Sequence, residues 1–240
     1  MKKQFLVLAL SFAVFMLNGQ DVNSVIQKHL KASGQEKLSK VESIVTSGTI
    51  SMPSMGMEMS FSLTKARPVL LKLESDFNGS PMIQVFNGTE GWTYAPGLGV
   101  PEPVEMGAQE ITSARSQAKI DNPFYNFEER GEKAELVGEE SFNDKPCFHV
   151  KLTSEEGNVV DYFINRDSYL LDGYITSQSI NGQDIMLQTS VSDYKKIKGT
   201  MQPLTSTVKM NGQVISIMKV NEIKFGAKAD PGNFGKPATE

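Results

Sequence analysis

From residue 43 onward, hydrophobic and polar residues alternate along most of the chain, which is the pattern of β-strands with one buried face. The alternation is clearest at 57–64, where Met57, Met59, Phe61 and Leu63 are separated by polar residues. Similar segments follow at 69–73, 82–86 and 91–94, and again from 134–142 to 213–225. Asn-Gly and other tight-turn pairs separate many of them, so the pattern predicts an antiparallel meander.

The region before the strands has a helical period instead. Residues 21–33 carry apolar side chains on one face of a predicted amphipathic helix, at Val22, Val25, Ile26 and Leu30. Asp21 is expected to cap its start, and Gly34 is expected to end it. A short second turn is expected at 35–40.

Two later segments depart from the alternation. Residues 95–103 contain three Pro and two Gly, which predicts a loop, and 104–119 favours a helix. This inserted loop and helix are expected to lie over the sheet as a lid. Residues 230–240 are expected to form a flexible C-terminal tail, and 21–229 a single domain.

The fold class predicted is mainly β (α+β), with one curved antiparallel sheet of about 10–11 strands forming a half-barrel. Such a sheet curls, and its concave apolar face has to be covered. Two helices cover only part of that face. The remainder is either filled by side chains or left as a cavity for an apolar ligand.

The first 20 residues have the features of a secretory signal peptide. Lys2 and Lys3 precede a mostly apolar run at 5–17, which is shorter than a bilayer core requires. We therefore expect a periplasmic protein released by cleavage near residue 20. An uncleaved membrane anchor is the alternative.

Composition narrows the chemistry further. The 240 residues carry a net charge of −4 and no Lys/Arg run longer than two, which argues against binding to nucleic acid. The single cysteine, Cys147, and the two histidines, His29 and His149, are too few for the usual zinc sites. We expect structural or surface roles for these three residues. No nucleophile and base are paired in a recognisable motif, so we expect neither catalysis nor a cofactor.

Methionines cluster at one place in the chain. Met52, Met55, Met57 and Met59 lie within eight residues, and two of them share the apolar face with Phe61. Methionine is flexible and polarizable, so this cluster fits either a soft core patch or a surface for irregular apolar ligands.

Three short motifs resemble the outer-membrane lipoprotein-sorting family with the LolA/LolB-like fold. They are LTKARP at 63–68, NGTEGWTYAP at 87–96 and DNPF at 121–124. The resemblance implies a half-open barrel whose hydrophobic cavity is covered by helices. It also implies a periplasmic, non-enzymatic carrier of lipoproteins or other acylated molecules. The long loop at 95–103 departs from the family, so the fold carries over more safely than the cargo.

Site predictions follow from the alternation and the resemblance together. The expected cavity wall is Met57, Met59, Phe61, Leu63, Leu71, Leu73 and Trp92, of which Trp92 comes from the aromatic motif. By the resemblance, Arg67 is the latch that bonds the lid and holds it closed. The expected ligands are acyl chains of lipoproteins or other lipids. A monomer with possible transfer partners at the inner and outer membranes is expected. The alternative is an envelope-stress sensor or scaffold that uses the same fold to bind proteins.

Overall fold

The computed structural model describes residues 21–180, 183–226 and 228–239. The predicted signal peptide lies outside these residues, and so does Asn181–Gly182, one of the Asn-Gly pairs predicted to form tight turns. The helices are α1 (Val22–Ser33), α2 (Gln35–Leu38) and α3 (Ala108–Ala118). The first strands are β1 (Ser43–Met52), β2 (Met57–Ala66), β3 (Leu70–Phe77), β4 (Ser80–Phe86), β5 (Gly91–Ala95) and β6 (Val100–Glu105). The strands after α3 are β7 (Lys133–Phe142), β8 (Lys145–Thr153), β9 (Val159–Asn165), β10 (Leu171–Ile180), β11 (Gln183–Ser192), β12 (Lys195–Ile197), β13 (Thr200–Gln202), β14 (Thr205–Met210) and β15 (Gln213–Gly226).

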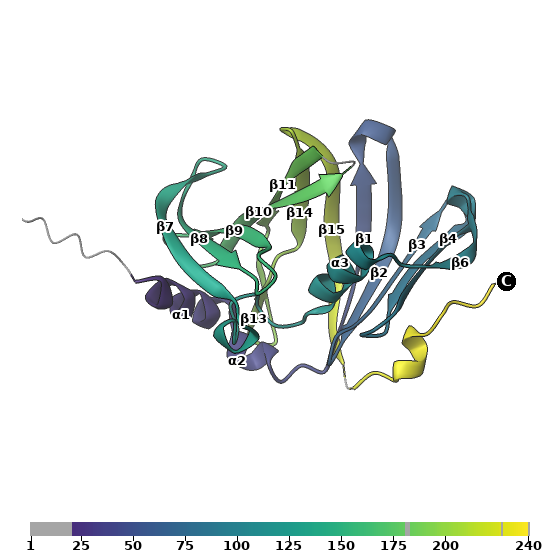
Figure 1. The fold of residues 1–240 in the computed structure, drawn as a ribbon, viewed down its shortest axis with the longest axis horizontal. Coiled ribbons are helices and arrows are strands. Elements are labelled where there is room, and N and C mark those ends of the chain that lie inside the picture. Colours follow the sequence, from purple (N-terminus) through teal and green to yellow (C-terminus); the bar gives the residue numbers. More distant parts are fainter. Residues whose placement is uncertain (1–20, 181–182, 227, 240) are drawn as a thin grey trace, which may run out of the picture.

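Thirteen of these strands form one antiparallel sheet, in the order β6-β5-β4-β3-β2-β1-β15-β14-β11-β10-β9-β8-β7. The sheet is curved and does not close, as Figure 1 shows, which confirms the predicted half-barrel class. Strand β1 lies in the middle because it pairs with β15 on one side and β2 on the other. The first and last strands of the described chain are thereby neighbours in the sheet.

The sheet has more strands than expected, and one of them corrects a predicted loop. Residues 100–105, expected to be loop and helix start, form β6 and pair with β5. Pro101 and Pro103 are compatible with this strand because β6 lies at the sheet edge, where a missing N–H breaks no ladder. Helix α3 accordingly begins at Ala108 rather than at residue 104.

The two faces of the sheet differ in what covers them. We call the face against which α1 and α3 pack the inner face, and the opposite one the outer face (Figure 1). On β2 the inner face carries the apolar residues of the alternation, and the outer face carries Glu58, Ser60 and Ser62. The period of two therefore separates the apolar from the polar face, as predicted.

Helix α1 covers the β7–β9 end of the inner face. Its Val25 and Ile26 are fully buried against Phe148 and Val150 of β8. Gly34 ends the helix at φ 80°, and its amide donates to the carbonyls of Leu30 and Lys31, as expected of the C′ residue. Asp21 is the N-cap residue, as predicted, and its carbonyl accepts from the amide of Val25, but its side chain makes no cap hydrogen bond.

The C-terminal segment packs on the outer face. A 3-10 turn at Pro231–Phe234 places Phe234, which is only 2% exposed, against Ala66, Leu70 and Val85. The expected flexible tail is thus anchored at this residue, because burial of one aromatic ring outweighs the local freedom of the surrounding Gly and Pro.

Candidate functional site

An apolar strip runs along the inner face of strands β1–β4, beside α3. Its central members, here called the inner strip, are Ile50, Met57, Met59, Phe61, Leu63 and Leu73. Ile50, Met59 and Phe61 are buried, whereas Met57, Leu63 and Leu73 keep part of their surface exposed. No helical residue belongs to this cluster. The inner strip is therefore apolar surface that the sheet supplies without a helix above it.

Six of the seven predicted wall residues lie on this face. Strand register pairs Leu63 with Leu73, and Phe61 lies two residues before Leu63 on the same side of β2. Leu71 is also on the inner face, but it is buried beneath α3 with Phe86, Ala114 and Ala118. Alternation within β2 and β3 was sufficient to place all six together.

Trp92 is not part of this wall, which corrects the prediction. It pairs with Val85 of β4, and Val85 packs on the outer face against Phe234. The neighbouring Phe86 faces inward to α3, so Trp92 lies on the side opposite the inner strip. The aromatic motif gave its position in sequence but not the register of β5 against β4, and that register decides the face.

Helix α3 covers one end of the strip and stops there. Its apolar residues Ile111, Ala114 and Ala118 contact the part of the sheet around Leu71. Leu63 touches both this helix-covered cluster and the uncovered inner strip. Helix α3 thus has the position of a partial lid over one part of the inner face (Figure 1). Leu63 lies at the margin of the cluster that α3 covers.

Arg67 joins three segments at the foot of this lid. Its Nη1 and Nη2 donate to the two carboxylate oxygens of Asp121, at 2.6 and 2.9 Å. Its Nε donates to the carbonyl of Val41 at 2.8 Å, and Nη2 also reaches the carbonyl of Leu38 at 3.2 Å. Because Asp121 lies three residues after the end of α3, this fork ties the exit of the lid helix to α2 and to the end of β2.

The acid in this fork is held ionised. Burial alone would raise the pKa of Asp121, but hydrogen bonds from Arg67 and Gln35 outweigh it and hold the pKa below its usual value. The Gln35 side chain donates to Asp121 at 2.7 Å and accepts from the backbone amide of Asn122 at 2.9 Å. The DNPF motif is therefore bonded at successive residues to the helical segment before β1.

His29 extends the same network into α1. Its Nδ1 lies 2.7 Å from the Tyr169 carbonyl and its Nε2 lies 2.8 Å from the Asn122 side-chain nitrogen. These partners fit a neutral ring that donates from Nδ1 and accepts at Nε2. Burial lowers the pKa of His29, in keeping with the neutral form. Sequence analysis gave His29 a structural role and missed its link to Asn122, which only the fold brings near.

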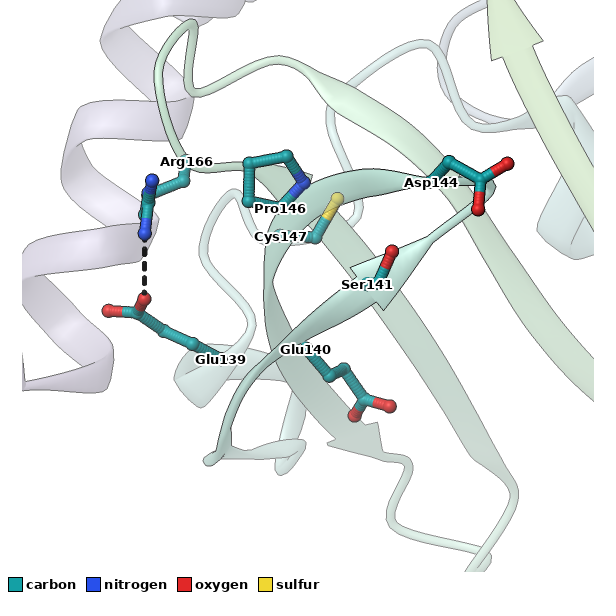
Figure 2. A pocket seen from close by; sticks show the side chains of 7 residues that line it. All are labelled: Glu139, Glu140, Ser141, Asp144, Pro146, Cys147 and Arg166. Atoms are coloured by element: carbon teal, nitrogen blue, oxygen red, sulfur yellow. Dashed lines mark hydrogen bonds and ion pairs between the residues drawn. The ribbon is translucent and has the colours of Figure 1, made fainter.

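Two pockets that the structure defines lie away from the inner strip. The first, about 360 Å³, is lined at the β7–β8 hairpin by Glu139, Glu140, Ser141, Asp144, Pro146, Cys147 and Arg166. Figure 2 shows Arg166 facing Glu139, to which it is bonded at 3.4 Å. The second, about 190 Å³, lies under the C-terminal segment beside Ile83 and Val85.

The residues of the first pocket carry no evident reaction chemistry. Burial, together with Asp172, raises the pKa of the Cys147 thiol to about 12, so it stays protonated at neutral pH. His149 lies two residues further along β8 and is bonded to Glu140 and Asp161. Within residues 21–180, 183–226 and 228–239, no cluster of three or more His, Cys, Asp or Glu is placed to hold a metal ion. In the same residues, no helix has the length and apolar character needed to cross a bilayer.

A curved, open antiparallel sheet with helices packed against its inner face defines a class of half-barrel proteins. Three solved structures place the chain in that class by fold. A LolA superfamily protein from Nitrosomonas europaea matches with a TM-score of 0.59 and 13% identity, over 90% of this chain and 97% of that one. A DUF1329 family protein from Desulfovibrio piger matches with a TM-score of 0.61 and 12% identity, over 89% and 97%.

The third structure is a domain assigned to outer membrane lipoprotein sorting, from Vibrio parahaemolyticus. It matches with a TM-score of 0.57 and 10% identity, over 88% of this chain and 97% of that one. No protein-family model and no curated protein sequence matches the chain. The chain therefore has the LolA-like fold, and at these identities the likeness extends to the fold alone.

Proposed function

We propose that this protein is a periplasmic, non-enzymatic carrier that holds the acyl chains of lipoproteins or other lipids against the inner strip. The observation that supports it most is the strip itself, a contiguous row of apolar side chains of which Met57, Leu63 and Leu73 stay partly exposed, beside a helix that covers only one end. Contiguous exposed apolar surface in a water-soluble protein usually marks a binding site. Each CH₂ group that leaves water contributes about 0.8 kcal/mol, so burial alone supplies affinity for a lipid tail.

The methionines of the inner strip support an alternative function. Met52, Met57 and Met82 pack against the cluster that contains the buried Met59, which makes the strip adaptable as well as apolar. Such a surface also suits an apolar segment of a protein partner. The alternative proposal is thus an envelope-stress sensor or scaffold that binds a protein at the same place.

Native mass spectrometry of the protein purified from a periplasmic extract tests whether it is a carrier or a scaffold. A carrier is expected to show an added mass that matches phospholipid, fatty acid or lipopeptide. A clean apo mass, together with no uptake of fatty acid by the purified protein, would exclude the carrier function. A stoichiometric bound polypeptide without lipid would favour the scaffold.

The site is tested by one pair of variants on β2. Leu63→Asn places an amide on the inner strip, and Thr64→Asn places the same group on the outer face of the adjacent position. Burial of a leucine side chain is worth about 1.5–3 kcal/mol, so Leu63→Asn should weaken binding of a C12 amphiphile by about tenfold or more. Thr64→Asn should bind as the parent does. Equal affinities in the two variants would remove the inner strip from the site.

A further inference from the structure

One charged side chain lies on the apolar inner face. In β2 the alternation that places Met57, Met59, Phe61 and Leu63 inward continues to Lys65. Register pairs Lys65 with Ile44 of β1 and Leu71 of β3, both of which are buried. Among the inner-face positions of β1–β5, every one of them described, Lys65 is the single charged residue.

The ammonium group of Lys65 has no partner among the described residues. Asp121, the acid held by Arg67 just beyond the end of β2, is already bonded by Arg67 and Gln35 through both oxygens. On the outer face of the same sheet, by contrast, Lys72 is paired with Glu74 at 2.7 Å. Lys65 is partly buried, and a cation that has lost part of its water without gaining an anion is costly.

The position of Lys65 matches the geometry of an amphiphile. It is the next inward residue after Leu63 and pairs with Leu71, so it lies at the α3-covered end of the row of inward residues that continues into the inner strip. From Lys65 to Met57 the strand spans eight residues, or about 26 Å at 3.3 Å per residue. One leaflet of a bilayer contributes about 15 Å of hydrocarbon, so an extended acyl chain fits along this length.

We propose that Lys65 binds the anionic group of a lipid, a carboxylate or a phosphate, whose acyl chain lies along the inner strip. This inference rests on the proposed function and narrows its ligand to amphiphiles with a negative charge next to the chain. Burial lowers the pKa of Lys65 to about 8, so the group still carries its charge at pH 7. A neutral diacylglyceryl group would leave that charge unpaired.

Calorimetric titration at pH 7 with three C12 probes tests the proposal. Dodecanoate and dodecyl phosphate supply the two anionic groups, and monododecanoylglycerol is the neutral control, all below their aggregation concentrations. The parent protein should bind at least one anionic probe roughly 10- to 100-fold more tightly than the neutral one, as expected for a charge-assisted hydrogen bond shielded from water. The tighter of the two anions identifies a fatty-acid or a phospholipid headgroup.

Three variants test whether the preference for anionic probes depends on Lys65. Lys65→Met keeps length and removes the charge, so it should lose the anionic preference and retain binding of the neutral probe. Lys65→Arg should keep the preference. Lys72→Met removes a lysine from the outer face of the adjacent strand and should behave as the parent does.

The outcomes separate the two proposals. Equal binding of all three probes by the parent, or an anionic preference that survives in Lys65→Met, would overturn the role of Lys65 and leave the apolar carrier intact. Failure of the parent to bind any of the three probes would overturn both.

Discussion

Removal of the Arg67 fork is expected to release the lid while the sheet remains folded. In Arg67→Ala the lost contacts are two hydrogen bonds to Asp121 and two to backbone carbonyls of the α2 region. Asp121 keeps only the donor from Gln35. Since the fork joins the exit of α3 to α2 and β2, its loss acts directly on the segment that positions the lid.

The size of the effect follows from burial. Removal of one partner from a buried ion pair costs about 3–5 kcal/mol. The side chains of Arg67 and Asp121 keep 25% and 23% of their surface exposed, so water replaces part of the interaction, and about 2–3 kcal/mol is expected. In a domain of this size that lowers Tm by about 4–12 °C. If the fork stabilises only the closed lid, the ratio of open to closed molecules rises roughly 30- to 150-fold.

Hydrogen exchange and dye binding measure the two parts of this prediction. Amides of α3 should exchange faster in Arg67→Ala well below its Tm, while amides of β8 under α1 should be unchanged. The apolar dye ANS should bind more strongly as the apolar cluster beneath α3, which contains Leu71 and Phe86, is exposed. Arg67→Lys should rescue poorly, because an ammonium cannot reproduce the planar fork. A double-mutant cycle with Asp121→Asn should show coupling between the two residues.

Two results would refute the latch. If Arg67→Ala lowers Tm but α3 and β8 amides accelerate equally, the fork stabilises the whole fold and not the lid. If Tm, exchange and dye binding all match the parent, Arg67 is an ordinary surface arginine.

Three further outcomes are expected. Because burial lowers the pKa of His29, the unfolded chain binds a proton at this residue more readily than the folded chain does. The free energy of unfolding, measured by urea titration, should therefore fall as the pH drops below about 6.5. In His29→Gln this contribution to the pH dependence of the unfolding free energy should be absent. Phe234→Ala should lose about 3–5 kcal/mol in the same assay, and a loss under about 1 kcal/mol would mean that the C-terminal contact is not maintained in solution. Emission of Trp92 should stay constant during titration with dodecanoate, since it lies on the outer face, and a saturable shift would contradict the β4–β5 register.

Much of the architecture was predictable because it depends on local periodicity. Alternation with a period of two located most strands and separated the apolar side of β2 from its polar side. The helical stripe at 21–33 and the Gly34 terminus were predictable for the same reason. The wall residues on β2 and β3 followed from parity alone, because neighbours two apart in a strand share a face whatever the strand pairs with.

The predictions from sequence were wrong where the structure depends on contacts between segments that are distant in the chain. Strand β6 contains two prolines that indicate a loop, but it forms because it needs only one partner at the sheet edge. Phe234 is distant in sequence from Val85, and nothing local to 230–240 indicates that contact. The motif around Trp92 predicted an aromatic residue after a turn, but it did not predict which face of the sheet that residue occupies. The face depends on the register of β5 against β4, which the turn between them sets. In that turn the Asn87 side chain accepts hydrogen bonds from the amides of Thr89 and Glu90.

The sequence by itself determined which residues of each strand share a face, the two-helix start and the presence of an arginine at the end of β2. Tertiary structure alone decided which face α3 covers, that Asp121 meets Arg67 across 54 residues of chain, and that Lys65 is left inside without an acid. Periodicity is a property of one segment and survives in any packing. Register, lid position and ion pairing are relations between segments, and they are fixed only when the curved sheet brings those segments into contact.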